Sequence, residues 1–163
     1  MKDDVKSSWS NRWKSPSADT VLTFDDIIKI IKKNNFHSIH IGTDSHIKKG
    51  SNGKHIFATV ICLYEVGNGA FYYFSRETHK RAFRTLSDRI MEEASRSITL
   101  AQEIYVQFPN RKIVIHSDTN TDERYPTTKF TPTIRNWAKA IGVDFVAKPE
   151  AWAATSVADW HAK

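Results

Sequence analysis

The sequence predicts an α/β domain built on a mixed sheet, and two patterns lead to this class. Residues 36–76 hold three strand patterns joined by short turns, which is typical of an antiparallel meander. After them, stretches with apolar residues every three or four positions alternate with apolar strand patterns at 111–118 and 143–147. A helix between two strands implies a crossover that lays the second strand parallel to an earlier one. The sheet should therefore contain both antiparallel and parallel strands.

Length and composition fit one globular domain without a membrane span. The chain has 163 residues, of which 40% are hydrophobic and 12% aromatic, so it can bury a full core. No apolar run reaches about 18 residues, and Met1–Thr20 lacks the apolar segment of a secretory signal. The single cysteine, Cys62, cannot form an internal disulfide, so we expect a reducing, cytoplasmic compartment. The net charge of +6 favours a polyanionic partner.

The chain begins with a polar arm over residues 1–20, and we place the domain at residues 21–163. Trp9 and Trp13 stand among the polar residues of the arm. We expect these tryptophans to dock on the domain, and stacking on nucleic-acid bases is the alternative. Thr23-Phe-Asp-Asp resembles a capping box, and the apolar residues that follow have helical spacing. A helix should therefore open the domain.

The first strand of the meander, Phe36–His46, carries an acid on an interior face. Its β-branched residues alternate with His40, Gly42 and Asp44, so these three share a face. Burying a lone carboxylate is costly. A basic partner, a hydrogen-bond network or a metal ion must therefore compensate Asp44. The other two strands are expected at Ile56–Tyr64 and Ala70–Ser75.

Two more acids are expected to face the sheet. A long helix is predicted at about Ala82–Gln107, and Glu93 falls on or beside its apolar stripe. Glu92 is turned about 100° further away, and it remains the competing candidate. The fourth strand, Arg111–Asp118, ends in the acid Asp118.

Two helices and one strand complete the predicted chain. Thr131 caps a helix that has Pro132 at its first position. A short strand, Val143–Ala147, follows it. The last helix is expected at about Glu150–Ala162, and it carries a fourth acid, Asp159.

Three stretches of the chain resemble one known family: Ile41-Gly-Thr-Asp-Ser-His46, Ile115-His-Ser-Asp118 and Lys148-Pro-Glu-Ala-Trp-Ala-Ala-Thr-Ser-Val-Ala-Asp-Trp-His-Ala-Lys163. They are similar to the YkuK-type family of predicted ribonuclease H-like nucleases, and the match holds in order over roughly residues 20–163. The resemblance implies a ribonuclease H-like α/β fold, with a five-stranded mixed sheet of order 3-2-1-4-5 and helices on both faces. It also implies divalent-metal-dependent hydrolysis of a nucleic acid.

The chain departs from the family pattern at three places. Trp160 stands where a basic residue is expected, and His46 stands where a glutamine is expected. Asp118 is followed by Thr-Asn-Thr-Asp, which differs from the family's loop. These departures leave the substrate open among an RNA–DNA hybrid, a branched DNA junction and single strands. The choice between endo- and exonuclease and the oligomeric state also stay open.

By this resemblance, four carboxylates would hold two Mg²⁺ or Mn²⁺ ions. Asp44 would bridge the ions and Asp118 would lie beside it, while Glu93 and Asp159 would approach from the two helices. Two such ions about 3.5–4 Å apart activate a water and stabilise the leaving oxygen. His161, close to Asp159 in the last helix, would transfer protons. Zinc is disfavoured, because the chain has no cysteine pair and no His-x₃-His spacing.

Other polar side chains are expected around the acids and along the path of the substrate. Those expected to form hydrogen bonds around the acids, or to orient water, are His40, His116, Ser45 and Asn120. Those expected to contact nucleic-acid phosphates are Lys48, Lys49, Arg76, Lys80, Arg81, Arg84, Arg124 and Lys129. The alternative function is a non-catalytic nucleic-acid- or protein-binding module of the same fold, and a structural component of a larger assembly is the third option.

Overall fold

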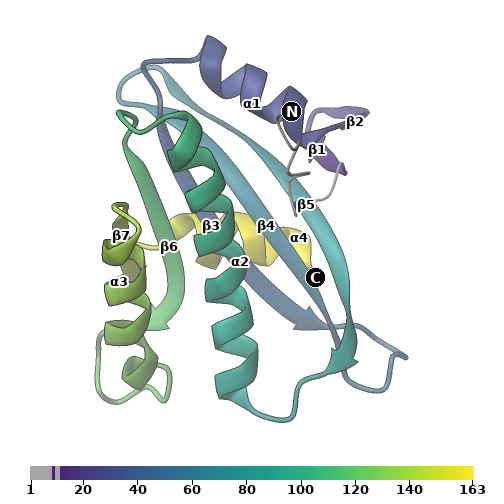
Figure 1. Ribbon diagram of the computed structural model, residues 1–163. Coiled ribbons are helices and arrows are strands. Elements are labelled where there is room, and N and C mark those ends of the chain that lie inside the picture. Colours follow the sequence, from purple (N-terminus) through teal and green to yellow (C-terminus); the bar gives the residue numbers. More distant parts are fainter. Residues whose placement is uncertain (1–8, 10–11) are drawn as a thin grey trace, which may run out of the picture.

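The computed structural model describes Trp9 and residues 12–163, and the rest of the predicted arm lies outside the described residues. The strands (Figure 1) are β1 (Trp13–Ser15), β2 (Ala18–Leu22), β3 (Ser38–Ile47), β4 (Lys54–Glu65), β5 (Gly69–Ala82), β6 (Ile113–Asn120) and β7 (Asp144–Lys148). The helices are α1 (Phe24–Lys33), α2 (Leu86–Gln107), α3 (Thr131–Ala140) and α4 (Asp159–Ala162). A 3₁₀ turn, η1 (Thr128–Phe130), precedes α3, and a π-helix, η2 (Ala153–Ala158), leads into α4.

All seven strands form one mixed sheet with the order β2-β1-β5-β4-β3-β6-β7. The predicted α/β class is confirmed, but the prediction of five strands is wrong, because the sheet has seven and its full order therefore differs from 3-2-1-4-5. The five predicted strands keep that order within it, as β5-β4-β3-β6-β7. The physical reason is the hairpin of β1 and β2, which pairs with the edge of β5 through Trp13 and Ser75. The side chain of Trp13 is fully buried and packs near Phe24, so this part of the predicted arm belongs to the core.

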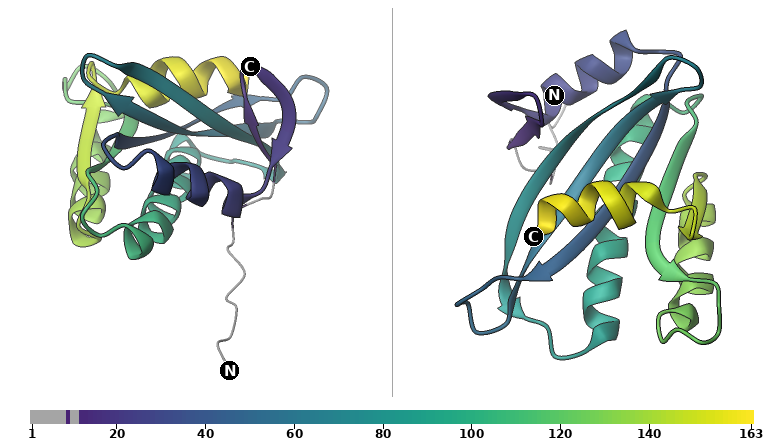
Figure 2. Two further views of the ribbon diagram at one scale, coloured as in Figure 1. Left: turned by 90° about the horizontal axis from the view of Figure 1, so that it is seen from above. Right: turned by 180° about the vertical axis from the view of Figure 1, so that it is seen from behind.

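Helices cover both faces of the sheet (Figure 2). The larger core lies under α1 and α2 and contains isoleucines from both helices and from β3, such as Ile27, Ile41 and Ile98. The predicted capping box of α1 is present, with Thr23 Oγ1 accepting from the Asp26 N–H. On the other face, η2 and α4 lie across the strands over a smaller core. Within the described part of the chain, no helix has the length and apolarity needed to cross a bilayer.

Three element boundaries differ from the predictions. The strand β3 runs from Ser38 to Ile47 rather than from Phe36 to His46, and its last residue is paired with His55 of β4. Strand β5 runs to Ala82 rather than Ser75, so α2 begins at Leu86. The last helix is split into η2 and α4 and begins at Ala153 rather than at Glu150.

A crevice is expected where β3 and β6 separate. These strands are parallel neighbours, and their pairing ends at Gly42 and His116. Past these residues the two strands diverge: β3 leads into the hairpin with β4 on one side, and β6 leads towards β7 on the other. Ligands of α/β proteins commonly bind outside the carboxyl ends of strands at such a switch point. Asp44 and Asp118 each lie two residues past the last paired position.

Candidate active site

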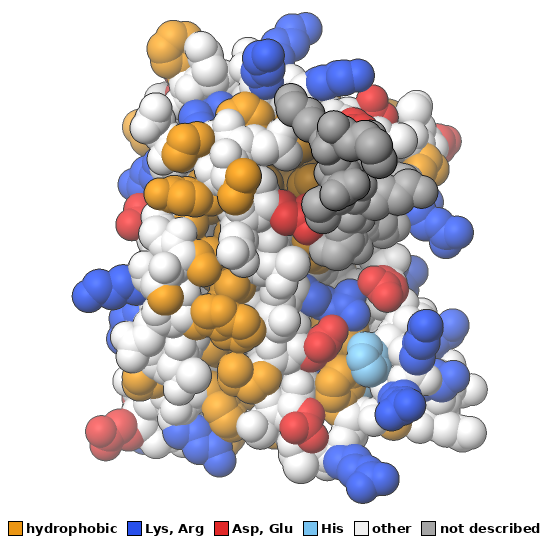
Figure 3. Space-filling model, viewed as in Figure 1, with side chains coloured by type: hydrophobic (Ala, Val, Ile, Leu, Met, Phe, Trp, Pro, Cys, Tyr) orange, Lys and Arg blue, Asp and Glu red, His pale blue; other side chains and the backbone are white. Residues whose placement is uncertain are grey.

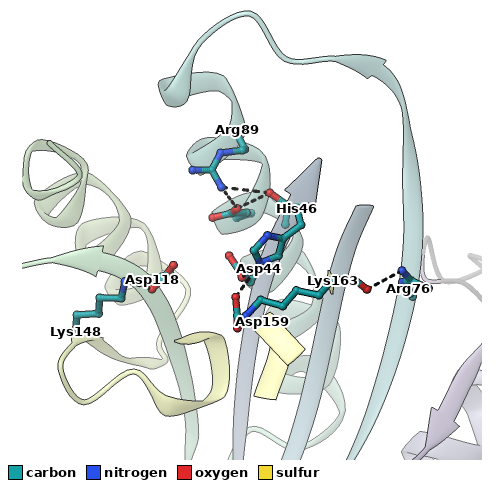
Figure 4. Close-up of polar contacts among 10 residues, drawn as sticks. Asp44, His46, Arg76, Arg89, Asp118, Lys148, Asp159 and Lys163 are labelled. Carbon is teal, nitrogen blue, oxygen red and sulfur yellow. Dashed lines mark hydrogen bonds and ion pairs between the residues drawn. The ribbon is translucent and has the colours of Figure 1, made fainter. Parts of the chain in front are cut away.

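Asp44 and Asp159 form the centre of the site (Figure 4). Asp44 lies on β3 and is 5% exposed, and Asp159 is the first residue of α4. His46 Nε2 lies 2.7 Å from Asp159 Oδ1 and 3.4 Å from Asp44 Oδ2, so the imidazole connects both carboxylates. Lys163 Nζ lies 2.7 Å from Asp159 Oδ2. In this arrangement, residues more than one hundred positions apart in the chain meet at one point.

Gly42 allows the C-terminal helical segment to reach this position. A Cβ atom at residue 42 would lie 2.6 Å from the Ala154 nitrogen and 2.7 Å from the Ala153 carbonyl carbon. Both distances are shorter than any normal contact, so only glycine lets η2 lie this close to β3. The alanines of η2 are themselves fully buried against the sheet. Asp159 follows directly after η2, and its position near Asp44 therefore depends on Gly42.

The described residues contain one group of three side chains whose ligand atoms all lie within 4.8 Å of one another. These side chains are Asp44, His46 and Asp159. The predicted ligands Glu93 and Asp118 lie outside this group, although both affect its electrostatics. His46 was absent from the predicted site. Strand parity could have identified it, since it lies two residues after Asp44 on the same face of β3.

Glu93 approaches from α2 on the opposite face of the sheet. It is 8% exposed, and its Oε1 accepts hydrogen bonds from Ser45 Oγ at 2.7 Å and from Arg89 Nη1 at 3.1 Å. The competing candidate, Glu92, instead pairs with Arg96 at 2.8 Å. The structure thus places Glu93, and not Glu92, next to the strand that carries Asp44.

Asp118 lies on β6 beside these acids and is about one-quarter exposed. Its Oδ1 lies 2.7 Å from Lys148 Nζ, an ion pair that the sequence did not indicate. Asp118 and Glu93 line the same cavity of about 10 Å³ between α2 and β6. Asp118 and Glu93 thus lie near each other and affect the charge of Asp44, but Glu93 and Asp159 lie on opposite faces of the sheet.

Burial and mutual repulsion set the ionisation of this cluster. Burial, with a further contribution from the charge of Asp118, raises the pKa of Asp44 from 3.8 to about 7. Burial, followed by the charge of Asp44, raises the pKa of Glu93 from 4.5 to about 8. For Asp159 burial acts in the same direction, but hydrogen bonds from Lys163 and His46 outweigh it and lower the pKa. The cluster thus holds buried carboxyls whose ionisation a nearby cation would favour.

His40 and His116 form a hydrogen-bonded chain next to the acids. The Ala153 N–H donates to His116 Nδ1 at 3.3 Å, which leaves Nε2 as the protonated nitrogen of a neutral ring. That nitrogen lies 2.8 Å from His40 Nδ1, and His40 Nε2 lies 2.8 Å from Ser38 Oγ. Burial lowers the pKa of His40 to about 4 and that of His116 to about 3, so both rings are neutral at physiological pH. The pair fastens η2 to the sheet, and its described hydrogen bonds do not reach the acids.

Two other predicted site residues have partners away from the acid cluster. His161 Nε2 lies 2.9 Å from the Tyr72 hydroxyl, and its ring stacks on Phe74 at 3.7 Å. Asn120 Oδ1 accepts from the Asp122 N–H at 3.0 Å and organises the loop after β6. Among the described contacts, neither side chain meets an acid of the cluster.

The predicted basic residues do not form one continuous patch. Lys48 and Arg76 line the same groove, together with Lys163. Arg124 pairs with Asp122 in its own loop, and Lys129 lies 5.1 Å from the ring centroid of Phe130. The remaining four, all exposed, lie in the hairpin after β3, at the end of β5 and in the loop after β5: Lys49, Lys80, Arg81 and Arg84. Figure 3 shows Lys and Arg scattered around the rim of the face that carries α2.

Comparison with known proteins supports the family that the motifs indicated. The family model described as Ribonuclease H-like matches residues 22–163, which is most of the chain. No curated protein and no solved structure matches the chain. The closer resemblance to the YkuK-type group is compatible with this match. With its mixed sheet and its converging acids, the chain belongs to the ribonuclease H-like family.

Proposed function

We propose that this protein is a divalent-metal-dependent nuclease that hydrolyses phosphodiester bonds of a nucleic acid. The observation that carries the proposal is the meeting of Asp44, Asp159 and His46 at one point, just past the position where the pairing of β3 with β6 ends. Hydrolytic sites of this kind need clustered carboxylates that face a substrate channel. Membership of the ribonuclease H-like family supports the same reaction class.

The donor set fits a hard divalent cation. Two carboxylates and one imidazole can supply ligand atoms, and carboxylate oxygens are the ligands that Mg²⁺ and Mn²⁺ prefer. Burial, with a further contribution from neighbouring acids, raises the pKa values of Asp44 and Glu93, so a bound cation would favour their ionised forms. The single cysteine, Cys62, is buried in the smaller core, which argues against a thiolate metal site.

Each residue of the centre has a role in this proposal. Asp44 and Asp159 would hold the first ion, and Glu93 and Asp118 would hold a second in a two-metal arrangement. When bound, such ions lower the pKa of a water nucleophile and stabilise charge on the phosphate. Ser45 and Arg89 fix the orientation of Glu93 through their hydrogen bonds.

One observation favours the non-catalytic alternative. Lys148 and Lys163 each place an ammonium group 2.7 Å from an acid of the cluster, at Asp118 and at Asp159. Ion pairs of this kind neutralise carboxylates without a metal. A binding module that retains the family fold would keep the acids as structural ion pairs.

A cleavage panel separates the two functions. Labelled single strands, duplexes and RNA–DNA hybrids are incubated with Mg²⁺ or Mn²⁺, beside Asp44→Asn and a control, Asp144→Asn, at an exposed position on β7. The nuclease proposal expects metal-dependent cleavage that falls at least about 100-fold in Asp44→Asn and persists in the control. Cleavage that survives Asp44→Asn, or no cleavage of any substrate, contradicts it. Binding without cleavage supports the alternative.

A further inference from the structure

A basic groove lies next to the candidate active site, on the face of the sheet that carries α4. It has a volume of about 670 Å³ and is lined by residues of the β1, β4 and β5 strands, of α4 and of the hairpin after β3. Asp159 connects the groove to the acid cluster, because Lys163 both lines the groove and contacts Asp159. A molecule in the groove would therefore end beside Asp159.

The groove has an uncompensated positive charge. None of its described lining residues is acidic, whereas five are cationic: Arg12, Lys14, Lys48, Arg76 and Lys163. Lys163 pairs with Asp159, and Arg76 donates a hydrogen bond to the main-chain oxygen of Lys163 at 3.1 Å. Among the described residues, Arg12, Lys14, Lys48 and Arg76 form no ion pair with a carboxylate side chain. Their common face follows from strand parity, since Trp13 points into the larger core and Lys14 points the other way. This charge suits a chain of phosphates.

Aromatic side chains accompany these cations. Trp160 is 75% exposed and follows Asp159 directly in α4, where the family pattern would have a basic residue. The Phe74 and His161 rings, stacked at an interplanar angle of 13°, lie on the same face. Unpaired bases stack on exposed aromatic rings, whereas the bases of a duplex are already stacked inside it. Cations interleaved with aromatic rings are thus typical of a single-strand binding groove.

The width of the groove fits a short length of chain. From β3 to β1 the groove crosses three strand intervals, which at about 4.8 Å each span roughly 14 Å. At about 3.4 Å per nucleotide, the rise of a stacked strand, this is at most on the order of four nucleotides, and an extended single strand would place fewer there. We propose that the groove binds single-stranded nucleic acid and directs it to Asp159. This inference rests on the proposed function only for cleavage of the bound strand, and not for binding.

Binding can be measured without hydrolysis. In EDTA, fluorescence anisotropy follows a labelled 12-nucleotide oligothymidine and a 12-base-pair duplex as they bind the full chain. The groove predicts at least a tenfold preference for the single strand. Four lining cations that form no described ion pair with a carboxylate side chain predict that log K falls with log salt concentration with a slope of about −3, at about 0.7 per neutralised phosphate. Equal or tighter binding of the duplex would overturn the inference.

Substitutions test the two components separately. Trp160→Ala should weaken oligothymidine binding on the order of 10- to 100-fold, and Trp160→Phe should restore most of it. Lys14→Gln and Arg76→Gln should each lower the salt slope by about 0.7. The matched control, Lys29→Gln on the exposed side of α1, should change neither quantity.

The outcomes for binding and for catalysis can be told apart. If Trp160→Ala and the charge variants all bind oligothymidine normally, the proposal that the groove binds single strands is rejected, even if the protein shows Mg²⁺-dependent cleavage. Selective single-strand binding that depends on these side chains would support the groove, even if no substrate is cleaved.

Discussion

The most informative substitution at the acid cluster is Asp44→Asn, because it removes a buried charge while keeping the shape of the side chain. The pKa of Asp44 is raised from 3.8 in the unfolded chain to about 7 in the folded protein. Between these values the folded protein keeps a proton that the unfolded chain has released, so this carboxyl lowers stability as pH rises. At roughly 1.4 kcal/mol per pKa unit, the penalty is roughly 1–2 kcal/mol at pH 5 and roughly 4 kcal/mol at pH 8.

Asparagine does not ionise, so it is free of this pH-dependent penalty. The stability of Asp44→Asn relative to the parent protein should therefore increase by about 2–3 kcal/mol between pH 5 and pH 8. Histidines with lowered pKa values, such as His40 and His116, destabilise both proteins at low pH, and their effect cancels in the difference. Urea unfolding in EDTA at the two pH values measures the free energies of unfolding.

Adding Mg²⁺ extends the experiment. At pH 8, saturating Mg²⁺ should raise the stability of the parent protein and of Asp144→Asn, but not that of Asp44→Asn. The reasoning is refuted if the difference between parent and Asp44→Asn does not depend on pH. It is also refuted if the asparagine variant is relatively less stable at pH 8 than at pH 5.

Three further substitutions test neighbouring parts of the structure. Gly42→Ala should lower the free energy of unfolding in urea by on the order of 1–3 kcal/mol, because the added Cβ would collide with η2. The variant should also cleave more slowly, because the collision displaces Asp159. Unchanged stability would contradict this prediction. Arg111→Met removes the side chain that donates to three carbonyl oxygens in α1 and in the connection from α1 to β3. The substitution should lower the free energy of unfolding by about 2–4 kcal/mol. Unchanged stability would show that these hydrogen bonds are dispensable. Lys163→Met removes a cation from Asp159 and should raise Mn²⁺ affinity about three- to thirtyfold by calorimetry, whereas weaker binding would mean that the ammonium supports the site.

Local patterns predicted those parts of the fold that depend on neighbouring residues. The capping box at Thr23 and the parity of Asp44 are such patterns, and the structure contains both. The β1–β2 hairpin was missed because its polar residues give no strand pattern, and its stability comes from Trp13, which only the folded sheet buries. The docking of Trp13 on the domain was expected and is confirmed, but propensity gave no sign of the strand pairing around it.

The site shows the same division between local and long-range information. The side of α2 that faces the sheet followed from helical spacing, which placed Glu93 on it. The ion pair of Lys148 with Asp118 could not be predicted, because it depends on how β7 lies beside β6. The ion pair of Lys163 with Asp159 is local, since the two residues are four positions apart at helical spacing. The role of Gly42 also emerges only in the structure, where it lies under the backbone of η2.

The most direct test of the proposed metal centre is a crystal structure of the full chain grown with Mn²⁺, with anomalous differences recorded at the manganese edge. The proposal predicts an anomalous peak within about 2.0–2.3 Å of carboxylate oxygens of Asp44 and Asp159, and a second peak near Glu93 or Asp118 if two ions bind. Lys163 should then have moved away from Asp159. A map without a peak at Asp44, in which both lysine ion pairs persist at saturating Mn²⁺, would contradict the metal-dependent nuclease.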